Sequence, residues 1–237
     1  LTVRREAGDV FFVRGAAPET RIAAGITALT AVARFTDGTI DATASLRSAR
    51  GDAADAKLAI GTVAGAPAGR IARDAPLEFS LTGDVPSLQV LQPWIGSAAV
   101  VSGRAHLNVA ARGTVGRAAL YGTLKGEGLR LDAPQYGLHF TDGRLVAHAA
   151  DGRVVIDEIV LGAGAGTFRA SGEIAGLAPG DERPVARLAW RAEKFRAFNR
   201  PDLHLVVGGE GTAVAQGGKI TLSGKLAADE GKIVYLP

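Results

Sequence analysis

The sequence predicts an all-β fold, an elongated and curled antiparallel sheet with one apolar face. Hydrophobicity alternates at every second residue in many segments, which is the period of a strand with one buried face. In residues 166–174, for example, Phe168 and Ile174 share one face with small residues, while polar residues occupy the other. Residues 40–47 and 219–226 repeat this pattern. The expected shape is a trough with an apolar concave face.

Composition favours an extended sheet over a compact globule. Hydrophobic residues make up 47% of the chain but aromatic residues only 5%, so much of the apolar face is alanine and the core should be thin. Glycine contributes 32 of 237 residues, roughly twice the usual share of ~7%. We expect most of these glycines at strand ends and turns.

Alternation and turn residues together place the strands. They are predicted at residues 9–13, 20–28, 29–36, 39–47, 56–63, 77–83, 100–112, 117–125, 128–132, 136–141, 143–150, 153–161, 166–175, 184–193, 202–208, 211–216, 219–227 and 231–236. Asp-Gly and Gly-Gly pairs supply the positive φ of tight hairpin turns. Such pairs occur at residues 37–38, 142–143, 151–152, 208–209 and 217–218. The apolar residues change from even numbers at Leu124 to odd numbers at Leu129, which predicts a bulge at Gly126 and Gly128.

Two segments interrupt the β pattern. Leu88, Leu91 and Ile95 recur at helical spacing behind Ser87, which predicts one short helix near residues 87–95 with Ser87 as its cap. Residues 178–184 form a polar cluster that predicts an exposed loop. The whole chain, residues 1–237, is expected to be a single elongated domain, with a subdivision conceivable near residues 96–100.

Charge and cysteine content exclude several classes of protein. The net charge is only +3, and no run of Lys and Arg is interleaved with aromatic residues, so nucleic acid is not an expected partner. Cysteine is absent, which excludes disulfides and thiolate metal sites. No leader and no apolar run near ~20 residues is present. We therefore expect an excised fragment of a longer envelope protein whose targeting and anchoring segments lie elsewhere.

The candidate chemical motifs have simpler structural explanations. Residues 162–166 (GAGAG) follow a strand, but the last glycine of a dinucleotide fingerprint would fall on Thr167, and the next residues alternate at period two. A turn or bulge is expected there. Asp157 and Glu158 form a carboxylate pair inside an apolar run, but neighbours on a regular strand point to opposite faces, so joint catalysis is not expected.

The histidines lack metal-ligand spacing and occupy polar positions of their strands: His106, His139, His148 and His204. We expect solvated side chains, no metal, no cofactor and no enzymatic activity. Trp94 and Ile95 could pack or insert at a membrane surface, and the small size of their patch favours packing.

The apolar face is the main candidate for function. Its larger members are Leu107, Val109, Leu120, Leu124, Leu129, Leu131, Leu138, Phe140, Leu145, Phe168, Ile174, Leu205, Val207, Ile220, Leu222 and Leu226. Periodicity alone is compatible with the core of an ordinary sandwich or with an open groove. Frequent Ala and Gly at apolar positions leave room for a ligand or a curved wall, which favours the groove.

Several runs of the sequence resemble the C-terminal repeat-like region of the TamB family, in the AsmA-like group of envelope proteins. The resemblance covers most of the chain and is strongest after Phe79. It rests on patterns of Gly and apolar residues in the runs VSGRAHLNV (101–109), GTV (113–115), LYGTL (120–124), GLRL (128–131), GLHFTDGRL (137–145), GTFRASGEI (166–174), ITLSGKL (220–226) and EGKIVYLP (230–237). Residues 11–15 (FFVRG) are the best match near the N-terminus.

This resemblance implies a periplasmic segment of an inner-membrane-anchored protein of a Gram-negative bacterium. It implies a β-taco-like trough that carries phospholipid acyl chains between the membranes. It also implies partnership with an Omp85-type outer-membrane barrel (TamA-like), and contact with unfolded outer-membrane proteins during assembly of autotransporters. The alternative is a protein-interaction scaffold or chaperone that acts by β-strand augmentation without carrying lipid. A secreted, glycan-active β-solenoid would need aromatic platforms that this composition lacks.

Overall fold

The computed structural model describes residues 1–5, 7, 11–13, 21–23, 25–36, 38–63, 71–96, 98–150, 152–177 and 184–234. The predicted loop at 178–184 falls almost wholly outside this range, and so do Asp37 and Asp151 of two predicted turns and the end of the last predicted strand. The strands are β1 (Thr2–Arg4), β2 (Phe11–Val13), β3 (Arg21–Ala23), β4 (Ile26–Thr36), β5 (Thr39–Ser48), β6 (Ala53–Gly61), β7 (Pro76–Val85), β8 (Val100–Thr114), β9 (Arg117–Ala133), β10 (Leu138–Ala150), β11 (Arg153–Ala163), β12 (Gly166–Ala175), β13 (Val185–Asn199), β14 (Leu203–Gln216) and β15 (Lys219–Ile233).

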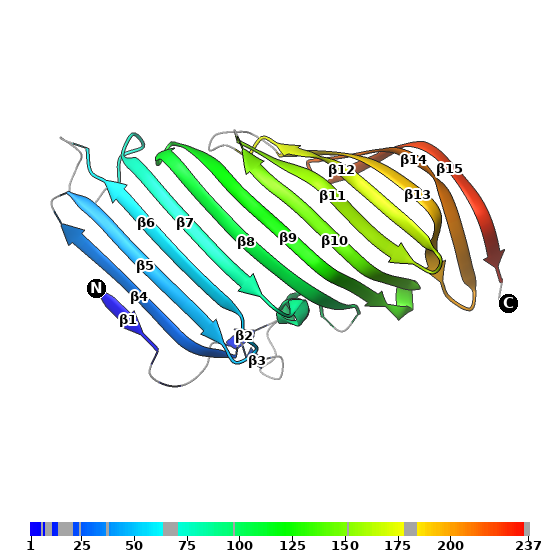
Figure 1. Cartoon of the computed structure of the whole chain (residues 1–237), viewed down its shortest axis with the longest axis horizontal. Helices are drawn as coiled ribbons and strands as arrows, with labels where there is room; N and C mark the ends of the chain where they lie inside the picture. The colour runs from blue at the N-terminus through cyan, green and yellow to red at the C-terminus, as the bar shows by residue number, and fades with distance from the viewer. Residues whose placement is uncertain are drawn as a thin grey trace.

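One antiparallel sheet contains nearly all of this structure. Its thirteen strands follow the order β1-β4-β5-β6-β7-β8-β9-β10-β11-β12-β13-β14-β15, and it is open at both edges (Figure 1). From β4 onward each strand pairs with the next one in sequence, as in a meander. Strands β2 and β3 pair separately with each other. The all-β, antiparallel prediction is confirmed.

The described sheet is a single layer. The accessible surface is 15236 Å², whereas a compact protein of this mass would expose about 10,000 Å². No large side chain in the described part of the chain is fully buried. The two-stranded β2–β3 pair is far smaller than the opposing sheet that a sandwich requires.

The sheet curls at its C-terminal end. Strands β10 and β13 come into direct contact although β11 and β12 lie between them in the sheet. At about 4.8 Å per strand, these two strands would be about 14 Å apart in a flat sheet. Figure 1 shows β4 to β10 spread side by side, while β12 to β15 turn behind one another at the other end. The predicted curled trough agrees with this shape.

Two predicted hairpin turns are wrong. Asp142-Gly143 lies inside β10, where the register with β9 and β11 shifts and Asp142 has φ 52°. Gly208-Gly209 lies inside β14, which runs unbroken from Leu203 to Gln216. A positive φ serves a bulge or a strongly coiled strand as well as a turn, so these pairs do not distinguish them. Gly217-Gly218 does form the turn before β15.

Several predicted strands are therefore halves of longer ones. Segments 117–125 and 128–132 form β9, with the predicted bulge confirmed at Gly128, which has φ +58°. Segments 136–141 and 143–150 contribute to β10, 202–208 and 211–216 to β14, and 219–227 to β15. The longest strands, such as β9 with 17 residues, exceed the usual length of about three to ten residues.

The short helix near residues 87–95 is confirmed as two consecutive turns. A 3-10 turn at Leu88–Leu91 leads into α1 (Gln92–Ile95). Ser87 makes no side-chain capping hydrogen bond, contrary to prediction. The segment is held at its other end, where Gln92 Nε2 donates to the carbonyls of Gly96 (2.6 Å) and Ala99 (2.7 Å).

Glycine is not confined to strand ends, as the sequence suggested. Gly209 and Gly224, both within strands, have φ +148° and +151°, and a Cβ on either would collide with the backbone of the neighbouring strand. These positions let β14 and β15 coil tightly around each other. Glycine therefore provides curvature as well as turns.

Candidate functional site

The register places one apolar residue of every long strand in a continuous row across the sheet. This apolar face is traced by Ala31, Ala44, Ala56, Leu81, Val109, Gly122, Ala149, Val154, Ile174, Ala186, Ala215 and Ile220, from β4 to β15. At a bulge, the apolar positions of a strand change from even to odd residue numbers or the reverse. The extra residue of the bulge compensates for this change, so the apolar side chains stay on the same face of the sheet.

All the lining residues predicted from the sequence lie on this face. Leu107 pairs with Leu124, and Leu131 with Phe140. The same register and the contacts described below place the others there: Val109, Leu120, Leu129, Leu138, Leu145, Phe168, Ile174, Leu205, Val207, Ile220, Leu222 and Leu226. Their surroundings differ, however. Ile220 and Leu222 on the edge strand are 70% and 69% exposed, whereas Val207 is buried.

The N-terminal half of the face carries an apolar hollow that sequence reasoning missed. Its volume is about 280 Å³, and alanines dominate its floor, with Leu58, Phe79, Leu1 and Val3 beside them. We call it the alanine hollow and define it by Ala31, Ala33, Ala42, Ala44 and Ala56. A second hollow of about 590 Å³ includes Phe35, Ile40 and Ile71. The alternation in residues 40–47 indicated that this half also has an apolar face. Its alanines were not among the predicted lining residues, because only the larger apolar side chains were chosen.

The C-terminal half of the face packs against itself. Phe195 and Val207 are buried together with Ala163 and Ala192, and Phe140, Leu161, Phe168, Trp190, Ala197 and Leu205 pack around them. We call Phe140, Phe168, Trp190 and Phe195 the aromatic cluster. Phe195 belongs to the buried core of the described structure, and the other three rings are partly buried against that core. Several predicted lining residues therefore form or border a core instead of an open wall.

The opposite, polar face carries close side-chain pairs between neighbouring strands, and each histidine is in one of them. His106 Nδ1 lies 2.7 Å from Asp84 Oδ1, and His148 Nδ1 lies 2.8 Å from Asp157 Oδ2. His139 similarly contacts Asp132, and His204 contacts Asn199 and Glu230. No group of three or more potential metal ligands occurs in the part of the chain that the structure describes. Exposed pairs of this kind add little stability and mainly favour one register.

Asp157 and Glu158 do not point to opposite faces, contrary to the sequence-based expectation. The register shifts between Ile156 and Ile159. Because of this shift, Ile156 and Ile159 both lie on the apolar face. Glu158 reaches Arg144 and Arg169 (3.5 Å each) on the polar face, where Asp157 meets His148. A bulge thus brings the two carboxylates to one side, where each is occupied by a cationic or histidine partner.

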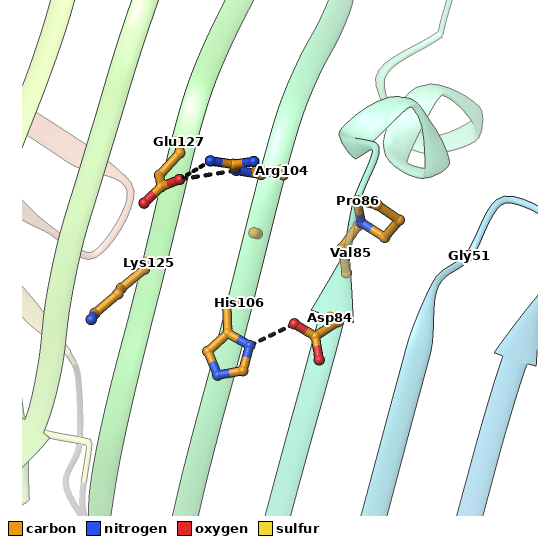
Figure 2. A pocket seen from close by; sticks show the side chains of 9 residues that line it. Gly51, Asp84, Val85, Pro86, Arg104, His106, Lys125 and Glu127 are labelled. Carbon is orange, nitrogen blue, oxygen red and sulfur yellow. Dashed lines mark hydrogen bonds and ion pairs between the residues drawn. The ribbon is translucent and has the colours of Figure 1, made fainter.

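A hollow of about 370 Å³ with charged side chains around it lies between β7, β8 and β9. Figure 2 shows Arg104 and Glu127 paired at one end, the Asp84–His106 pair at the other and Lys125 beside them. Arg104 Nε donates to Glu127 Oε2 at 2.9 Å, and this hydrogen bond lowers the pKa of Glu127. Two carboxylates, Asp84 and Glu127, lie here with the cationic Arg104 and Lys125, so the hollow has no strong preference for an anion or a cation.

The remaining motifs have structural roles. Residues 162–166 span the hairpin between β11 and β12, whose turn is Gly164 and Ala165, with Gly164 at φ +64°. The turn interpretation is confirmed, and a strand follows where a nucleotide-phosphate site would need a helix. Ile95 is half-buried on α1. The side chain of Trp94 lies outside the described part of the structure, so its packing, which the sequence favours over insertion at a membrane surface, stays a prediction.

Within the described residues, no helix is long and apolar enough to cross a membrane. Comparison of the chain with protein-family models, with curated proteins and with solved structures finds no match.

Proposed function

We propose that this chain is a periplasmic segment of a TamB-like envelope protein and that its apolar face holds phospholipid acyl chains during their passage between two membranes. The observation that carries the proposal is the unbroken apolar row across a single-layer sheet, which has no opposing sheet of comparable size among the described residues. A face of this size in water favours an apolar cover. The sequence resemblance to the TamB family supports the same proposal.

Acyl chains suit this face better than a specific small molecule. Burial of each methylene group contributes about 0.8 kcal/mol without any directional contact. The alanine hollow offers almost no polar surface, so it can hold an alkyl chain but cannot recognise a headgroup. The proposed role is non-enzymatic, because the histidines and the carboxylates that they contact, such as Asp84 and Asp157, lie on the opposite face.

Native mass spectrometry of the protein purified gently from bacterial membranes tests this proposal. We expect co-purified phospholipid on the wild-type protein and on Ala59→Asp, and its loss on Leu58→Asp. Leu58 borders the alanine hollow, whereas Ala59 is the next residue and points to the polar face, so both variants add one carboxylate. If Leu58→Asp fails to fold, Phe35→Asp replaces it, because Phe35 is 73% exposed and contributes little to stability. A lipid-free wild-type protein would contradict the proposal.

The scaffold alternative is favoured by one separate observation, the open edge of β15. This strand has fifteen residues, pairs only with β14 in the described sheet and is exposed along its length. Such an edge is a template for an added strand, as in a complex with an outer-membrane barrel of the Omp85 type or an unfolded outer-membrane protein. Binding of a partner strand that survives Leu58→Asp would favour this alternative over lipid carriage.

A further inference from the structure

The aromatic cluster fills the curled end of the apolar face. Phe140 and Phe195 have ring centroids 5.2 Å apart, and Phe168 and Phe195 have centroids 5.6 Å apart. Trp190 stacks on Phe168 at 6.4 Å with an interplanar angle of 14°. These contacts link β10, β12 and β13 across the concave side of the sheet. The space that a ligand would need there is occupied by the protein's own side chains.

Small residues in this region make room for the aromatic rings. Ala163 and Ala192 are buried in contact with the cluster, and Ala170 is directly opposite Trp190 in the register. Gly211 lies under the indole, because a Cβ there would be 2.8 Å from Trp190 Cζ2. Small side chains therefore do not indicate an open wall in this half. They leave the space that the large rings occupy, as in any close-packed core.

The curled end is also closed by contacts between two hairpins. The backbone N–H of Asn199 donates to the carbonyl of Gly137 at 2.8 Å, which joins the β13 end to the β9–β10 connection. Arg200 Nη1 donates to the carbonyl of Gln135 at 3.2 Å, and its guanidinium is held by Asp202. These bonds connect residues that are more than sixty positions apart in sequence.

The N-terminal half of the face has the opposite character. Ala31, Ala44 and Ala56 are consecutive across three strands, and the hollow above them is not filled by aromatic rings from these strands. Phe79 borders the hollow, and Phe35 on the same face is exposed. The same class of small residue thus forms an open floor at one end of the sheet and a filled core at the other.

We infer that the acyl-chain path is confined to the open part of the apolar face and ends at the aromatic cluster, which acts as a plug. This inference rests on the proposed function, since it specifies where on the face the chain lies. It assigns Phe140, Phe168, Trp190 and Phe195 as the residues that set the end of the path. An acyl chain gains little by entering this end, because it would have to displace the buried ring of Phe195 and the partly buried rings packed against it.

Photolabelling of the wild-type protein tests the inference. The probe is a phosphatidylglycerol with a diazirine on one acyl chain, presented in phosphatidylglycerol vesicles, and labelled residues are mapped by tandem mass spectrometry. We expect labelling several-fold denser on β4 to β7 than on β11 to β14. Equal or denser labelling around Phe168, Trp190 and Phe195 would overturn the plug while leaving lipid carriage intact. No labelling on any strand would overturn the proposed function and the plug with it.

A variant that opens the plug gives a second, independent outcome. In Phe195→Ala, we expect new labels on β10 to β13. Tyr121→Ala removes an exposed ring from the opposite, polar face, so it should leave the labelling pattern unchanged. If Phe195→Ala fails to fold, Phe168→Leu removes a ring with a smaller loss of volume. Circular dichroism confirms that the variant used retains its β content. An unchanged pattern in a folded, plug-opened variant would contradict the inference.

Discussion

The rings of Phe140 and Phe195 lie 5.2 Å apart although two whole strands separate β10 from β13 in the sheet. Parallel side chains on a flat sheet could not meet over that distance. The contact therefore requires curvature, and the curvature creates the core. Four predictions follow from the way this end of the sheet is built and from the open edge beyond it.

Removal of the central ring should destabilise the protein substantially. Phe195 is only 7% exposed and touches both Phe140 and Phe168. We expect Phe195→Ala to lower the free energy of unfolding by about 3 kcal/mol, the lower end of the range for buried Phe→Ala substitutions, because the core is thin. Urea unfolding followed by circular dichroism measures it. Phe35→Ala should be nearly neutral, and comparable losses in both variants would argue against a localised core.

The glycine beneath Trp190 should not tolerate a side chain. A Cβ at Gly211 would collide with the backbone carbonyl of Ser223 and lie 2.8 Å from Trp190 Cζ2. We expect Gly211→Ala to cost about 1–3 kcal/mol and to change tryptophan fluorescence, since the indole must shift. Gly231→Ala is the matched control, because its Cβ would meet only Leu205 Cδ1 at 3.8 Å. Equal effects of the two substitutions would contradict this packing.

Acid should weaken the closure between the two hairpins. The hydrogen bond from Arg200 lowers the pKa of Asp202 below its ordinary value in the folded protein. A lowered folded-state pKa contributes stability above the unfolded-state pKa, and this contribution is lost as the pH falls through the folded-state pKa. Between about pH 6 and about pH 2, wild type should lose more stability in urea than Asp202→Asn. Parallel losses would mean that Asp202 does not contribute through its charge.

The last strand should mediate self-association. β15 exposes Ile220, Leu222 and Leu226 beside an unpaired backbone edge, and exposed apolar edge strands promote pairing between molecules. We expect Leu222→Lys to reduce association in sedimentation velocity while it changes the free energy of unfolding by no more than about 0.5 kcal/mol. Thr221→Lys, on the polar face of the same strand, controls for the added charge. A wild-type protein that stays monomeric at every concentration would rule out this role.

Outside the bulges, alternation in the sequence was sufficient to assign residues to a face. Leu107, Leu124, Phe168 and Ile220 lie far apart in the chain, yet each was assigned to the apolar face and each lies there in the register. The side-chain period of a strand is a local property of two successive residues, so it can be read without knowledge of any partner. Glycine pairs were less informative. At Gly208-Gly209 the positive φ belongs to a coiled strand, and at Gly217-Gly218 it belongs to a turn.

The sequence by itself determined that the chain is all-β and which residues share its apolar face. Only the tertiary structure decided which part of that face is open and which is filled, because curvature depends on how neighbouring strands coil against each other. Ala44 and Ala192 illustrate this difference: both are alanines on the apolar face, but one lines a hollow and the other is buried beneath aromatic rings. The bulge that brings Asp157 and Glu158 to one side is likewise a property of paired strands, and no single strand encodes it.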